Sequence, residues 1–312
     1  MIDLHLHSTS SDGSATPSEL VLRGRQAGLT AMALTDHDTM SGANGFLEAC
    51  RMQGMTGIAG VEISAAVEEG HGTLHILGYG VNPGHPLAQE SLGRVLDGRA
   101  LRNGQILSKL NELGLELDWT EVLACAAAGV VGRVHFAQAM VARAYVLSVS
   151  EAFDRYLAKG RSAYAERYRL SPAEGIRMIR EAGGVAVIAH PFLWEADEVK
   201  LEAGLRGLKE MGLAGIEALY SDYNLEQTVT LLRLAIKLNL LKTGGSDYHG
   251  ISKPDIALGR GFGSLCVPDD FLPPLLQALG QDNPWVVVNE SVCAFSKGPL
   301  RGAQGELHGR QS

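Results

Sequence analysis

The chain begins with the stretch Ile2-Asp3-Leu4-His5-Leu6-His7-Ser8, and similar stretches recur along it. Residues 1–5 are predicted to form the first strand, and the period of two along an extended chain points His5 and His7 to the same side. The other predicted strands cover residues 31–34, 56–63, 72–79, 185–189, 215–219 and 240–243. Because helical patterns separate most of these runs, the sequence predicts βα units and a largely parallel sheet or barrel.

Helix-start signals support this alternation. Thr16, Pro17 and Glu19 provide an N-cap, a proline at the first helical position and a capping-box acceptor, so a helix is predicted from there to Gly28. Further helices are predicted to begin near Ser171-Pro172 and at Leu225. With about seven strands, the barrel has one strand fewer than a complete (β/α)₈ barrel.

The alternation is interrupted between Pro86 and Tyr168, where one helical pattern follows another without a strand. We therefore predict a barrel domain over residues 1–85 and 170–290, with a helical insertion over residues 86–169. Residues 297–312 are rich in Gly, Arg and Gln and are predicted to form a flexible tail. Between Arg133 and Arg169 basic side chains outnumber acidic ones, so the insertion is locally positive in an acidic chain.

Composition narrows the class of protein. The 312 residues carry a net charge of −8 and are 46% hydrophobic, which indicates a soluble, enzyme-sized protein and argues against non-specific binding to nucleic acid or anionic membranes. No apolar stretch reaches the roughly 18 residues that a membrane span needs. The polar residues Asp3 and His5 argue against a secretory signal. The four cysteines are scattered without a C-x-x-C pair, so we expect a reducing cytoplasm and no thiolate zinc site.

Most of the ten histidines lie close to a predicted strand end, where α/β barrels place their active sites. The polar residues in such positions are His5, His7, Asp12, His37, Glu62, His75, His190, Asp247 and His249. A single such histidine is more often structural than functional. Their repetition, at what we predict to be the carboxyl ends of strands, indicates a multinuclear metal site. Imidazole and carboxylate ligands without thiolate suit Mn²⁺, Zn²⁺ or Fe²⁺.

Such a site is suited to hydrolysing phosphate esters, because divalent cations neutralise the charge that repels a nucleophile and lower the pKa of a bound water to about 7. Hydrolysis of nucleoside triphosphates and dinucleotide redox chemistry are not indicated, since the sequence holds no G-x-x-x-x-G-K-[ST] and no G-x-G-x-x-G. It also holds no G-x-S-x-G nucleophile elbow. The sequence therefore predicts hydrolysis without a covalent nucleophile.

The motifs resemble those of a known family. The series DLHLHS, SDG, TDHDT, GVEIS, HILGY, AHP and GGSDYH is similar to that of the PHP (polymerase and histidinol phosphatase) metal-dependent phosphoesterases. The helical insertion and the string GRVHFAQAM further resemble one subgroup of this family. Its members are 3′,5′-nucleoside bisphosphate phosphatases of the RNase AM type, which also act as 5′ to 3′ exonucleases on short RNA.

The resemblance implies an α/β fold, a distorted (β/α)₇ barrel, holding about three divalent metal ions, with Mn²⁺ favoured over Zn²⁺ or Fe²⁺. Carried over by position, the ligands would be His5, His7, Glu62 and Asp247 for one ion, Glu62, His75 and His190 for a second, and Asp12, His37 and His249 for a third. Glu62 would bridge two ions, and the catalytic residues would be Glu62, Asp247, His249 and His37. Asp36 and Asp38 would orient the ligand between them.

The insertion is expected to choose the substrate. Arg102 and Asn103 share one face of a predicted helix with Arg99, although a solvated face is an equally good interpretation. Arg133 and His135 stand at the start of another predicted helix, where free N–H groups and a guanidinium favour a phosphate. We therefore predict that Arg102, Asn103, Arg133 and His135 bind a second phosphate of the substrate.

The predicted function is removal of the 3′ phosphate from nucleoside 3′,5′-bisphosphates, with short RNA oligonucleotides as a further substrate and no membrane or obligate protein partner. Histidinol phosphatase shares the ligands but needs a pocket for a cationic amine, which the basic insertion disfavours. An amidohydrolase would use a metal-bridging lysine, and no predicted strand ends in one. A non-catalytic metal-binding module is the remaining alternative. The sequence leaves open the physiological metal, the base preference, the main substrate length and the oligomeric state.

Overall fold

The computed structural model describes residues 1–68, 70–126 and 129–289, and the predicted tail lies outside them. Its strands are β1 (Ile2–Leu6), β2 (Ala31–Leu34), β3 (Thr56–Ser64), β4 (His75–Tyr79), β5 (Val185–Ala189), β6 (Gly215–Tyr220), β7 (Leu241–Gly245) and β8 (Val286–Val287). Its α-helices are α1 (Pro17–Gln26), α2 (Ala43–Gln53), α3 (Pro86–Glu112), α4 (Trp119–Cys125), α5 (Arg133–Ala142), α6 (Val149–Ala152), α7 (Pro172–Glu181), α8 (Glu198–Glu210), α9 (Leu225–Lys237) and α10 (Leu272–Leu279). A π-helical turn (Phe153–Leu157) follows α6, and 3-10 turns cover Pro191–Leu193, Gly250–Ser252 and Asp269–Phe271.

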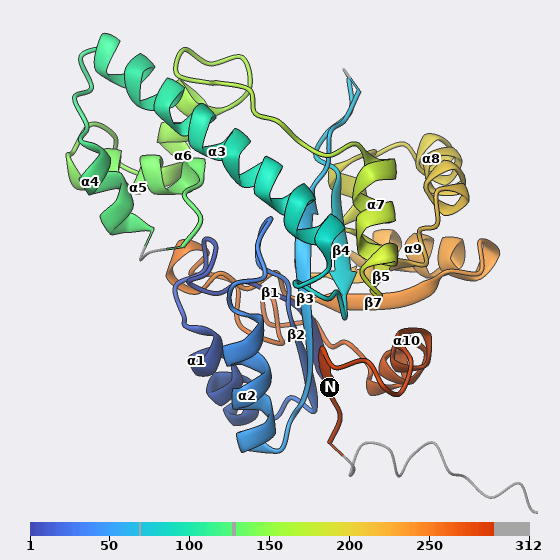
Figure 1. Ribbon diagram of the computed structural model, residues 1–312. Coiled ribbons are helices and arrows are strands. Elements are labelled where there is room, and N and C mark those ends of the chain that lie inside the picture. Colours follow the sequence, from blue (N-terminus) through green and yellow to red (C-terminus); the bar gives the residue numbers. More distant parts are fainter. Residues whose placement is uncertain (69, 127–128, 290–312) are drawn as a thin grey trace, which may run out of the picture.

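One sheet runs in the order β1-β2-β3-β4-β5-β6-β7, and β8 pairs with β3. The pairs β1–β2, β2–β3, β5–β6 and β6–β7 are parallel, as the alternation of strands and helices predicts. The chain after β7 returns to β1, where the N–H of Asp247 donates to the carbonyl of His5 with an N···O distance of 2.9 Å. The sheet is therefore a nearly closed seven-stranded barrel, which confirms the predicted α/β fold (Figure 1).

Strand β4 departs from the predicted parallel arrangement. It is antiparallel to both β3 and β5, because residues 65–74 turn the chain straight back instead of crossing over through a helix. It also begins at His75 and not at residue 72. His75 therefore lies at the amino end of its strand, so the prediction that it sits at the carboxyl end of a strand is wrong. The reversed direction of β4 nevertheless brings this end to the edge of the sheet where the parallel strands finish.

Local sequence signals place the helices well. The side chain of Thr16 accepts from the N–H of Glu19, and the Glu19 carboxylate accepts from the N–H of Thr16, so α1 carries the predicted capping box. Helix α7 repeats this arrangement with Ser171 and Glu174. Helix α5 begins at Arg133, as predicted.

Alternate residues of β3 show how the barrel is filled. Ala59, Val61 and Ile63 belong to a core that the sheet shares with the surrounding helices. Ile58 belongs to a second core, inside the barrel, which side chains of α10 also line. Glu62 lies on the same side as Ile58, because side chains alternate along a strand. This alternation directs a buried carboxylate into the barrel, at the end opposite α10.

The predicted insertion consists of helices α3 to α6, which have a hydrophobic core of their own. Ile106 of α3 and Phe136 of α5 are fully buried there. The first half of α3 packs on the barrel instead, through Ala88, Leu92 and Val95. The long helix α3 thus joins the barrel to the helical lobe (Figure 1). The domain boundaries themselves remain a prediction.

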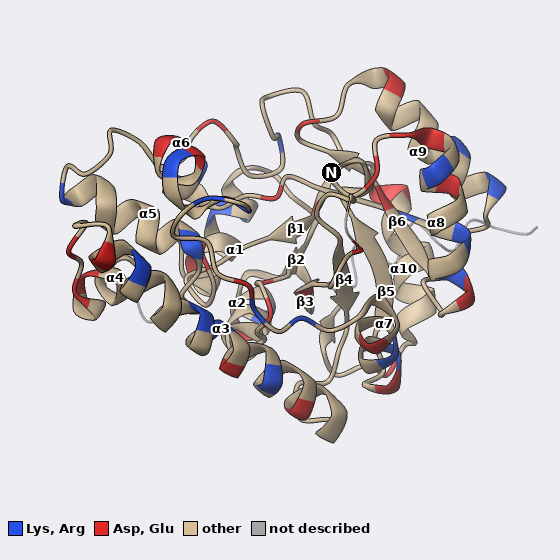
Figure 2. Ribbon diagram, turned by 90° about the horizontal axis from the view of Figure 1, so that it is seen from above, with Lys and Arg blue, Asp and Glu red and all other residues tan. Residues whose placement is uncertain are grey.

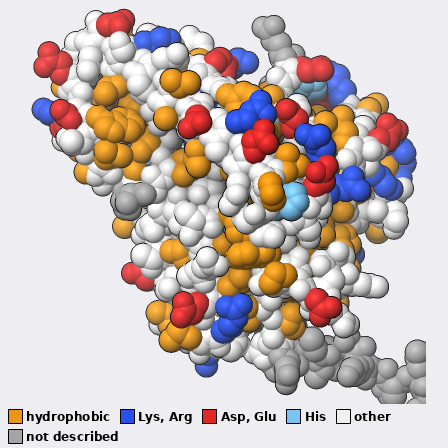
Figure 3. Space-filling view, in the orientation of Figure 1, with side chains coloured by type: hydrophobic (Ala, Val, Ile, Leu, Met, Phe, Trp, Pro, Cys, Tyr) orange, Lys and Arg blue, Asp and Glu red, His pale blue; other side chains and the backbone are white. Residues whose placement is uncertain are grey.

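Seen from above, helices α3 to α6 lie on one side of the sheet and α7 to α9 on the other (Figure 2). On the face shown in Figure 3, Lys and Arg side chains are mixed with Asp and Glu, and hydrophobic side chains lie in small groups. Among the described residues of that face, no large surface carries a single charge (Figure 3). Among the described helices, none is long and apolar enough to cross a membrane.

Candidate metal centre

The predicted ligands meet at one end of the barrel. They come from β1 and the loop after it, from the segment after β2, from β3, from the first residue of β4, and from the segments after β5 and β7. Three groups of these side chains hold ligand atoms that all lie within 4.8 Å of one another. The groups are His5, His7, Glu62 and Asp247; His7, Asp12, His37 and His249; and His37, Glu62 and His75.

The first group is the most deeply buried. Oε2 of Glu62 lies 3.2 Å from Nε2 of His5 and 3.1 Å from Nε2 of His7. Oδ1 of Asp247 lies 3.1 Å from the same atom of His7. One imidazole in β1 and one just beyond its end thus face a carboxylate of β3 and a carboxylate from the segment after β7, as the spacing of His5 and His7 predicts for a shared ion. The four residues are those that the family resemblance assigns to one metal.

The other two groups differ in part from the predicted sets. His37 stands between them, since it groups with Asp12 and His249 as well as with Glu62 and His75. His190 does not belong to the group of Glu62 and His75, although its Nε2 lies 3.0 Å from Oε1 of Glu62. The carboxylate of Glu62 therefore adjoins two groups, which is the position that a bridging ligand requires.

Unpaired atoms in this cluster test whether a cation fits. Nε2 of His5, both ring nitrogens of His7, Nδ1 of His37 and Oε2 of Glu62 are buried and have no hydrogen-bond partner among the described residues. A buried polar atom without a partner is costly, and native proteins avoid it unless an ion or a water satisfies it. Here five such atoms converge on small spaces between imidazoles and carboxylates. The cluster therefore fits divalent metal ions with nitrogen and oxygen ligands.

The charges of the cluster suit the same purpose. Burial by itself would raise the pKa of Glu62, but the surrounding imidazoles, His37 first among them, hold this pKa well below its usual range. Burial lowers the pKa of His37 to about 3, against the attraction of Glu62 and Asp12. Although burial by itself would lower it, the neighbouring carboxylates of Asp247 and Glu62 raise the pKa of His7 to about 9, so the carboxylates and imidazoles of the cluster interact strongly. A divalent ion binds ionised carboxylates and neutral imidazoles, and it would take the place of the proton that His7 holds.

Strained backbone supports the ligand positions. Asp38, His190 and Asp247 are non-glycine residues with positive φ, at 55°, 27° and 55°. Each lies directly beyond or near the end of a strand that serves the cluster, and such conformations persist only where the surrounding structure fixes them. Gly13 meets a related need, because a Cβ there would lie 2.2 Å from the carbonyl oxygen of His7. Only glycine lets the loop carrying Asp12 fold this closely over β1.

Glu217 is a supporting residue that the sequence analysis missed. Its Oε1 lies 2.9 Å from Nδ1 of His5, and its Oε2 accepts from the N–H of His190 over 2.8 Å. It is fully buried in β6. A carboxylate on the second ring nitrogen orients an imidazole and raises its basicity toward a metal. The available signal was an acidic residue inside the apolar strand GIEALY.

Asp247 is held in a similar way. Its Oδ2 accepts from the hydroxyl of Tyr220 over 3.0 Å and from Nζ of Lys253 over 2.6 Å. Its Oδ1 is thereby left facing His7 and His5. Lys253 follows a 3-10 turn beyond β7 and has no sequence pattern that marks it. These contacts fix one oxygen of the carboxylate and leave the other for a ligand role.

Three further aspartates hold the chain around the cluster. Asp36 accepts from the N–H and hydroxyl of Ser8, each over 2.7 Å, and from the hydroxyl of Ser11 over 2.6 Å. Asp3 binds Ser246 in the same way. Asp38 accepts from Arg99 and pairs with Arg167. The expectation that Asp36 and Asp38 orient His37 is therefore wrong in its detail, because their carboxylates bind other segments.

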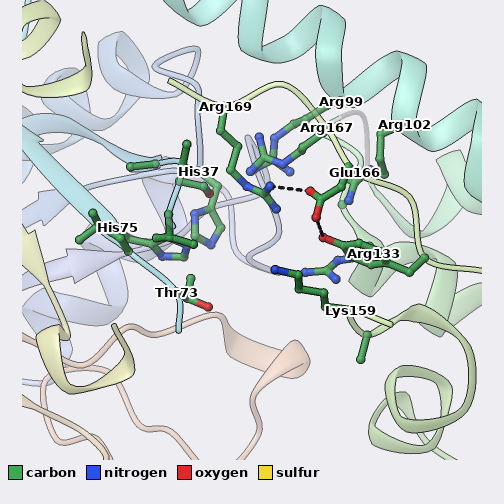
Figure 4. Close-up of a pocket in the computed structure, with 18 of the residues that line it drawn as sticks. His37, Thr73, His75, Arg99, Arg102, Arg133, Lys159, Glu166, Arg167 and Arg169 are labelled. Carbon is green, nitrogen blue, oxygen red and sulfur yellow. Dashed lines mark hydrogen bonds and ion pairs between the residues drawn. The ribbon is translucent and has the colours of Figure 1, made fainter. Parts of the chain in front are cut away.

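A cavity of about 840 Å³ opens beside the cluster. Asp12, His37 and His75 line one side of it, and helices and loops of the insertion line the other. Figure 4 shows His37 and His75 facing a group of basic side chains across the cavity. These side chains are Arg99, Arg102, Arg133, Lys159, Arg167 and Arg169. The positive charge of the insertion is thus concentrated next to the candidate metal centre.

The four predicted substrate-binding residues have different surroundings. Arg102 and Arg133 line the cavity. Asn103 and His135 are not among the described residues that line it, and both are engaged elsewhere. Nδ2 of Asn103 donates to the carbonyl of Val131 over 3.1 Å, and Nδ1 of His135 accepts from the N–H of Gly132 over 2.9 Å. His135 caps its own helix because glycine at the N-cap has no side chain to do so.

Arg102 is the basic residue most in need of an anion. It is 4% exposed, and its Nε and Nη2 have no hydrogen-bond partner among the described residues. Burial and the neighbouring guanidinium groups, that of Arg99 first, lower the pKa of Arg102 to about 8. Arg133 is better satisfied, since its Nη1 donates to the carbonyl of Leu157 and it lies over the rings of Phe153 and Tyr164. A phosphate would remove the penalty at Arg102.

Comparison with known proteins bears on this arrangement. The PHP domain family matches residues 3–158. A 3′,5′-nucleoside bisphosphate phosphatase from Chromobacterium violaceum is 30% identical, over 90% of this chain and 95% of the relative. A phosphoribosyl 1,2-cyclic phosphate 1,2-diphosphodiesterase from Eggerthella lenta is 34% identical, over 80% of this chain and 94% of the relative. A 5′-3′ exoribonuclease from Haemophilus influenzae is 34% identical, over 79% and 89%.

Solved structures agree in fold. A protein from Bifidobacterium adolescentis, classed as a metal-dependent phosphoesterase, superposes with a TM-score of 0.79 at 30% identity and covers 89% of this chain and 96% of its own. An amidohydrolase structure from Chromobacterium violaceum, with bound sulfate and no metal, gives 0.78 at 28% identity and covers 92% and 97%. Both matches extend through the barrel and the helical lobe.

Proposed function

Because the chain belongs to the PHP domain family, we propose that it is a metal-dependent phosphatase acting on nucleoside 3′,5′-bisphosphates. It removes the 3′ phosphate and gives nucleoside 5′-monophosphate and inorganic phosphate. It also degrades short oligoribonucleotides from 5′ to 3′, the activity named for the Haemophilus influenzae relative. Its location is the cytoplasm, as the scattered cysteines suggest.

One observation carries this proposal: the candidate metal centre opens directly into a cavity lined by six basic side chains. A substrate with one phosphate needs only the metal centre. A substrate with two phosphates has a use for both regions, with the reacting phosphate at the metals and the other among the guanidinium groups. Arg102, buried without a hydrogen-bond partner, supports a second anionic group in particular.

The residues divide the work between them. His5, His7, Asp12, His37, Glu62, His75, His190, Asp247 and His249 would hold about three ions, for which Mn²⁺ is the first choice and Zn²⁺ or Fe²⁺ the alternatives. When bound, the ions would neutralise the phosphate and acidify a water. Glu217 and Tyr220 orient ligands, and Arg102 and Arg133 bind the second phosphate. Glu62 adjoins two groups and is the proposed bridging ligand.

The alternatives differ in the ligand that the cavity would accept. A histidinol phosphatase binds a cationic amine, which six basic side chains would repel. A non-catalytic module has no use for such a cavity beside the metals. The amidohydrolase structure from Chromobacterium violaceum shares the fold, but a basic pocket suits an anionic substrate better than a neutral amide. The Eggerthella lenta relative adds a cyclic phosphodiester as a competitor.

A parallel assay tests the proposal. Phosphate release would be measured with added Mn²⁺ from adenosine 3′,5′-bisphosphate, AMP and histidinol phosphate, and hydrolysis followed for phosphoribosyl 1,2-cyclic phosphate and short 5′-phosphorylated RNA. We expect the bisphosphate to give AMP and phosphate, and AMP itself to be a poor substrate. Preference for histidinol phosphate or the cyclic phosphate would contradict the proposal.

Replacing Arg102 with alanine should lower kcat/KM for adenosine 3′,5′-bisphosphate by about 10- to 100-fold. A charge-assisted hydrogen bond in a desolvated site contributes about 1.5 to 3 kcal/mol, which corresponds to this range. p-Nitrophenyl phosphate offers no second phosphate, so its slow hydrolysis should fall much less. Arg133→Ala should act in the same direction. Arg155→Ala, which removes an exposed arginine of the insertion paired with Glu151, is the matched control. Equal losses on both substrates would remove Arg102 from the phosphate site.

Hydrolysis should proceed with inversion at phosphorus. Ser8, Ser11 and Ser246 are buried beside the cluster, and their hydroxyls donate to Asp36 or Asp3 and hold the chain in place. A single in-line displacement by water inverts the configuration, whereas a covalent phosphoenzyme gives net retention. A substrate with a chiral thiophosphate at the 3′ position measures the outcome. Retention, or a trapped phosphoserine or phosphohistidine, would require a nucleophile of the protein.

A further inference from the structure

We propose that Asp38 is a positioning residue that fixes Arg99 and Arg167 in the cavity and thereby sets the preference for a substrate with a second anionic group. The inference rests on the proposed function. It concerns a residue outside the metal ligands and outside the predicted phosphate binders.

The geometry joins two separate parts of the insertion at one atom. Oδ2 of Asp38 accepts from Nε of Arg99 over 2.9 Å and also from Nη2 of the same guanidinium. Nη2 of Arg167 lies 3.1 Å from the same oxygen. Arg99 comes from α3, whereas Arg167 comes from the segment before α7. Figure 4 shows the two guanidinium groups side by side at the wall of the cavity.

Asp38 is itself held rigidly. Its N–H donates to the carbonyl of Glu62 over 2.9 Å, and its Oδ1 accepts from the N–H of Ser64 over 3.0 Å. The carboxylate is fully buried. Its two oxygens thus have different roles, since one is bound to β3 and the other to the insertion. Asp38 ties the position of the guanidinium groups to the strand that carries the central metal ligand Glu62.

A carboxylate is needed here for an electrostatic reason. Arg99, Arg102 and Arg167 stand close together, and like charges at low exposure repel each other unless an anion lies between them. Asp38 supplies that anion to Arg99 and Arg167 in the absence of substrate. Nη1 of Arg167 and two nitrogens of Arg102 are still left without partners among the described residues. The arrangement therefore keeps donors preorganised for a phosphate, which lowers the cost of binding one.

Asp38→Asn tests the inference, because asparagine keeps the size of the side chain and removes its charge. We expect KM for adenosine 3′,5′-bisphosphate to rise about 10-fold or more, since misplaced binding groups typically cost this much. The value of kcat and the kcat/KM for p-nitrophenyl phosphate should change less than about threefold, because the metal ligands keep their places. Glu151→Gln, which removes an exposed carboxylate paired with Arg155 elsewhere in the insertion, is the matched control.

A binding measurement provides a readout without turnover. Calorimetric titration of AMP into metal-free protein reports the second-phosphate site alone, and Asp38→Asn should weaken AMP about 10-fold. Asp38→Asn combined with Arg167→Met should be little worse than either change alone, because both act on one contact. Equal loss on the bisphosphate and on p-nitrophenyl phosphate would overturn the inference, as would unchanged AMP affinity.

These experiments distinguish failure of the proposed function from failure of the role inferred for Asp38. If the wild-type protein hydrolyses no bisphosphate, the proposed function fails, and the AMP titration still decides whether Asp38 positions an anion site. If circular dichroism shows that Asp38→Asn does not fold, Arg99→Met and Arg167→Met decide instead. Each should raise KM for the bisphosphate selectively, and an equal loss on both substrates in either variant would overturn the inference.

Discussion

Replacing Glu62 with glutamine should lower kcat for adenosine 3′,5′-bisphosphate by about 10³-fold or more, which is about 4 kcal/mol in transition-state stabilisation. The carboxylate is fully buried, and its oxygens lie within about 3 Å of imidazoles that belong to two candidate metal groups. An amide has the same shape but offers a neutral oxygen and an N–H₂ group that repels a cation. The variant should therefore lose metal as well as turnover.

Structure and metal content separate this effect from misfolding. Metal bound per chain would be measured by atomic emission after gel filtration, and the fold by circular dichroism. Glu226→Gln, on the exposed start of α9, is the control for the loss of one glutamate charge. Unchanged turnover in Glu62→Gln, or full loss of turnover with full metal content, would contradict the bridging role proposed for this residue.

The positions of the ligands could be predicted from sequence because the rule behind them is local. In a parallel barrel the ends of the strands meet at one edge, so polar residues after successive apolar runs must come together. His5, His37, His190 and Asp247 follow this rule. His75 reaches the same edge by a different route, since β4 runs in the opposite direction. Strand direction depends on the connection between strands, and an apolar run of five residues contains no sign of it.

The residues that support the ligands were harder to predict for a related reason. Glu217 contacts His5, which lies 212 positions away in the chain. Asp38 was expected to act on its neighbour His37, yet its carboxylate binds Arg99 and Arg167 of the insertion. The partners of a short polar side chain are the groups that lie near it in the folded protein. Spacing along the chain does not determine which groups these are. Each of them can nevertheless be recognised as an acidic residue in a segment that is otherwise buried.

The predicted face of α3 is correct for two of its residues, which line the cavity, and wrong for a third. Arg99 and Arg102 share the face of α3 that lines the cavity, as their spacing predicts. Asn103 lies one position further round and donates to Val131 instead. Successive residues of an α-helix lie about 100° apart around its axis, so a predicted face can be wider than the part of it that lines a cavity. Which side of that face meets the cavity depends on how α3 packs across the barrel.

Removing metal should abolish activity, and this is the second large effect that we expect. Dialysis against a chelator followed by assay in metal-free buffer should leave less than about 1% of the wild-type rate, because the candidate ligand groups consist of imidazoles and carboxylates, which cannot neutralise the reacting phosphate without the cations. Mn²⁺ should restore activity better than Mg²⁺, since imidazole ligands favour the softer ion. Residual metal has to be measured in the same samples. Full turnover in protein shown to be free of metal would end the metal hypothesis.

The thermal stability of the folded protein should also depend on bound metal, and measuring it provides a check that needs no substrate. Ions that bind only the folded protein add about 2.7 kcal/mol at a free concentration 100-fold above Kd, so Tm should rise by several degrees on adding Mn²⁺. Imidazole binds a metal only in its neutral form, so protons compete with the ion. The rise in Tm at a fixed Mn²⁺ concentration should therefore be larger at pH about 8 than at pH about 6.

In Glu62→Gln the rise in Tm should shrink at both pH values, because this variant lacks the carboxylate that two of the metal groups share. A rise in Tm that is independent of pH and unaffected by Glu62→Gln would mean that Mn²⁺ binds elsewhere on the protein.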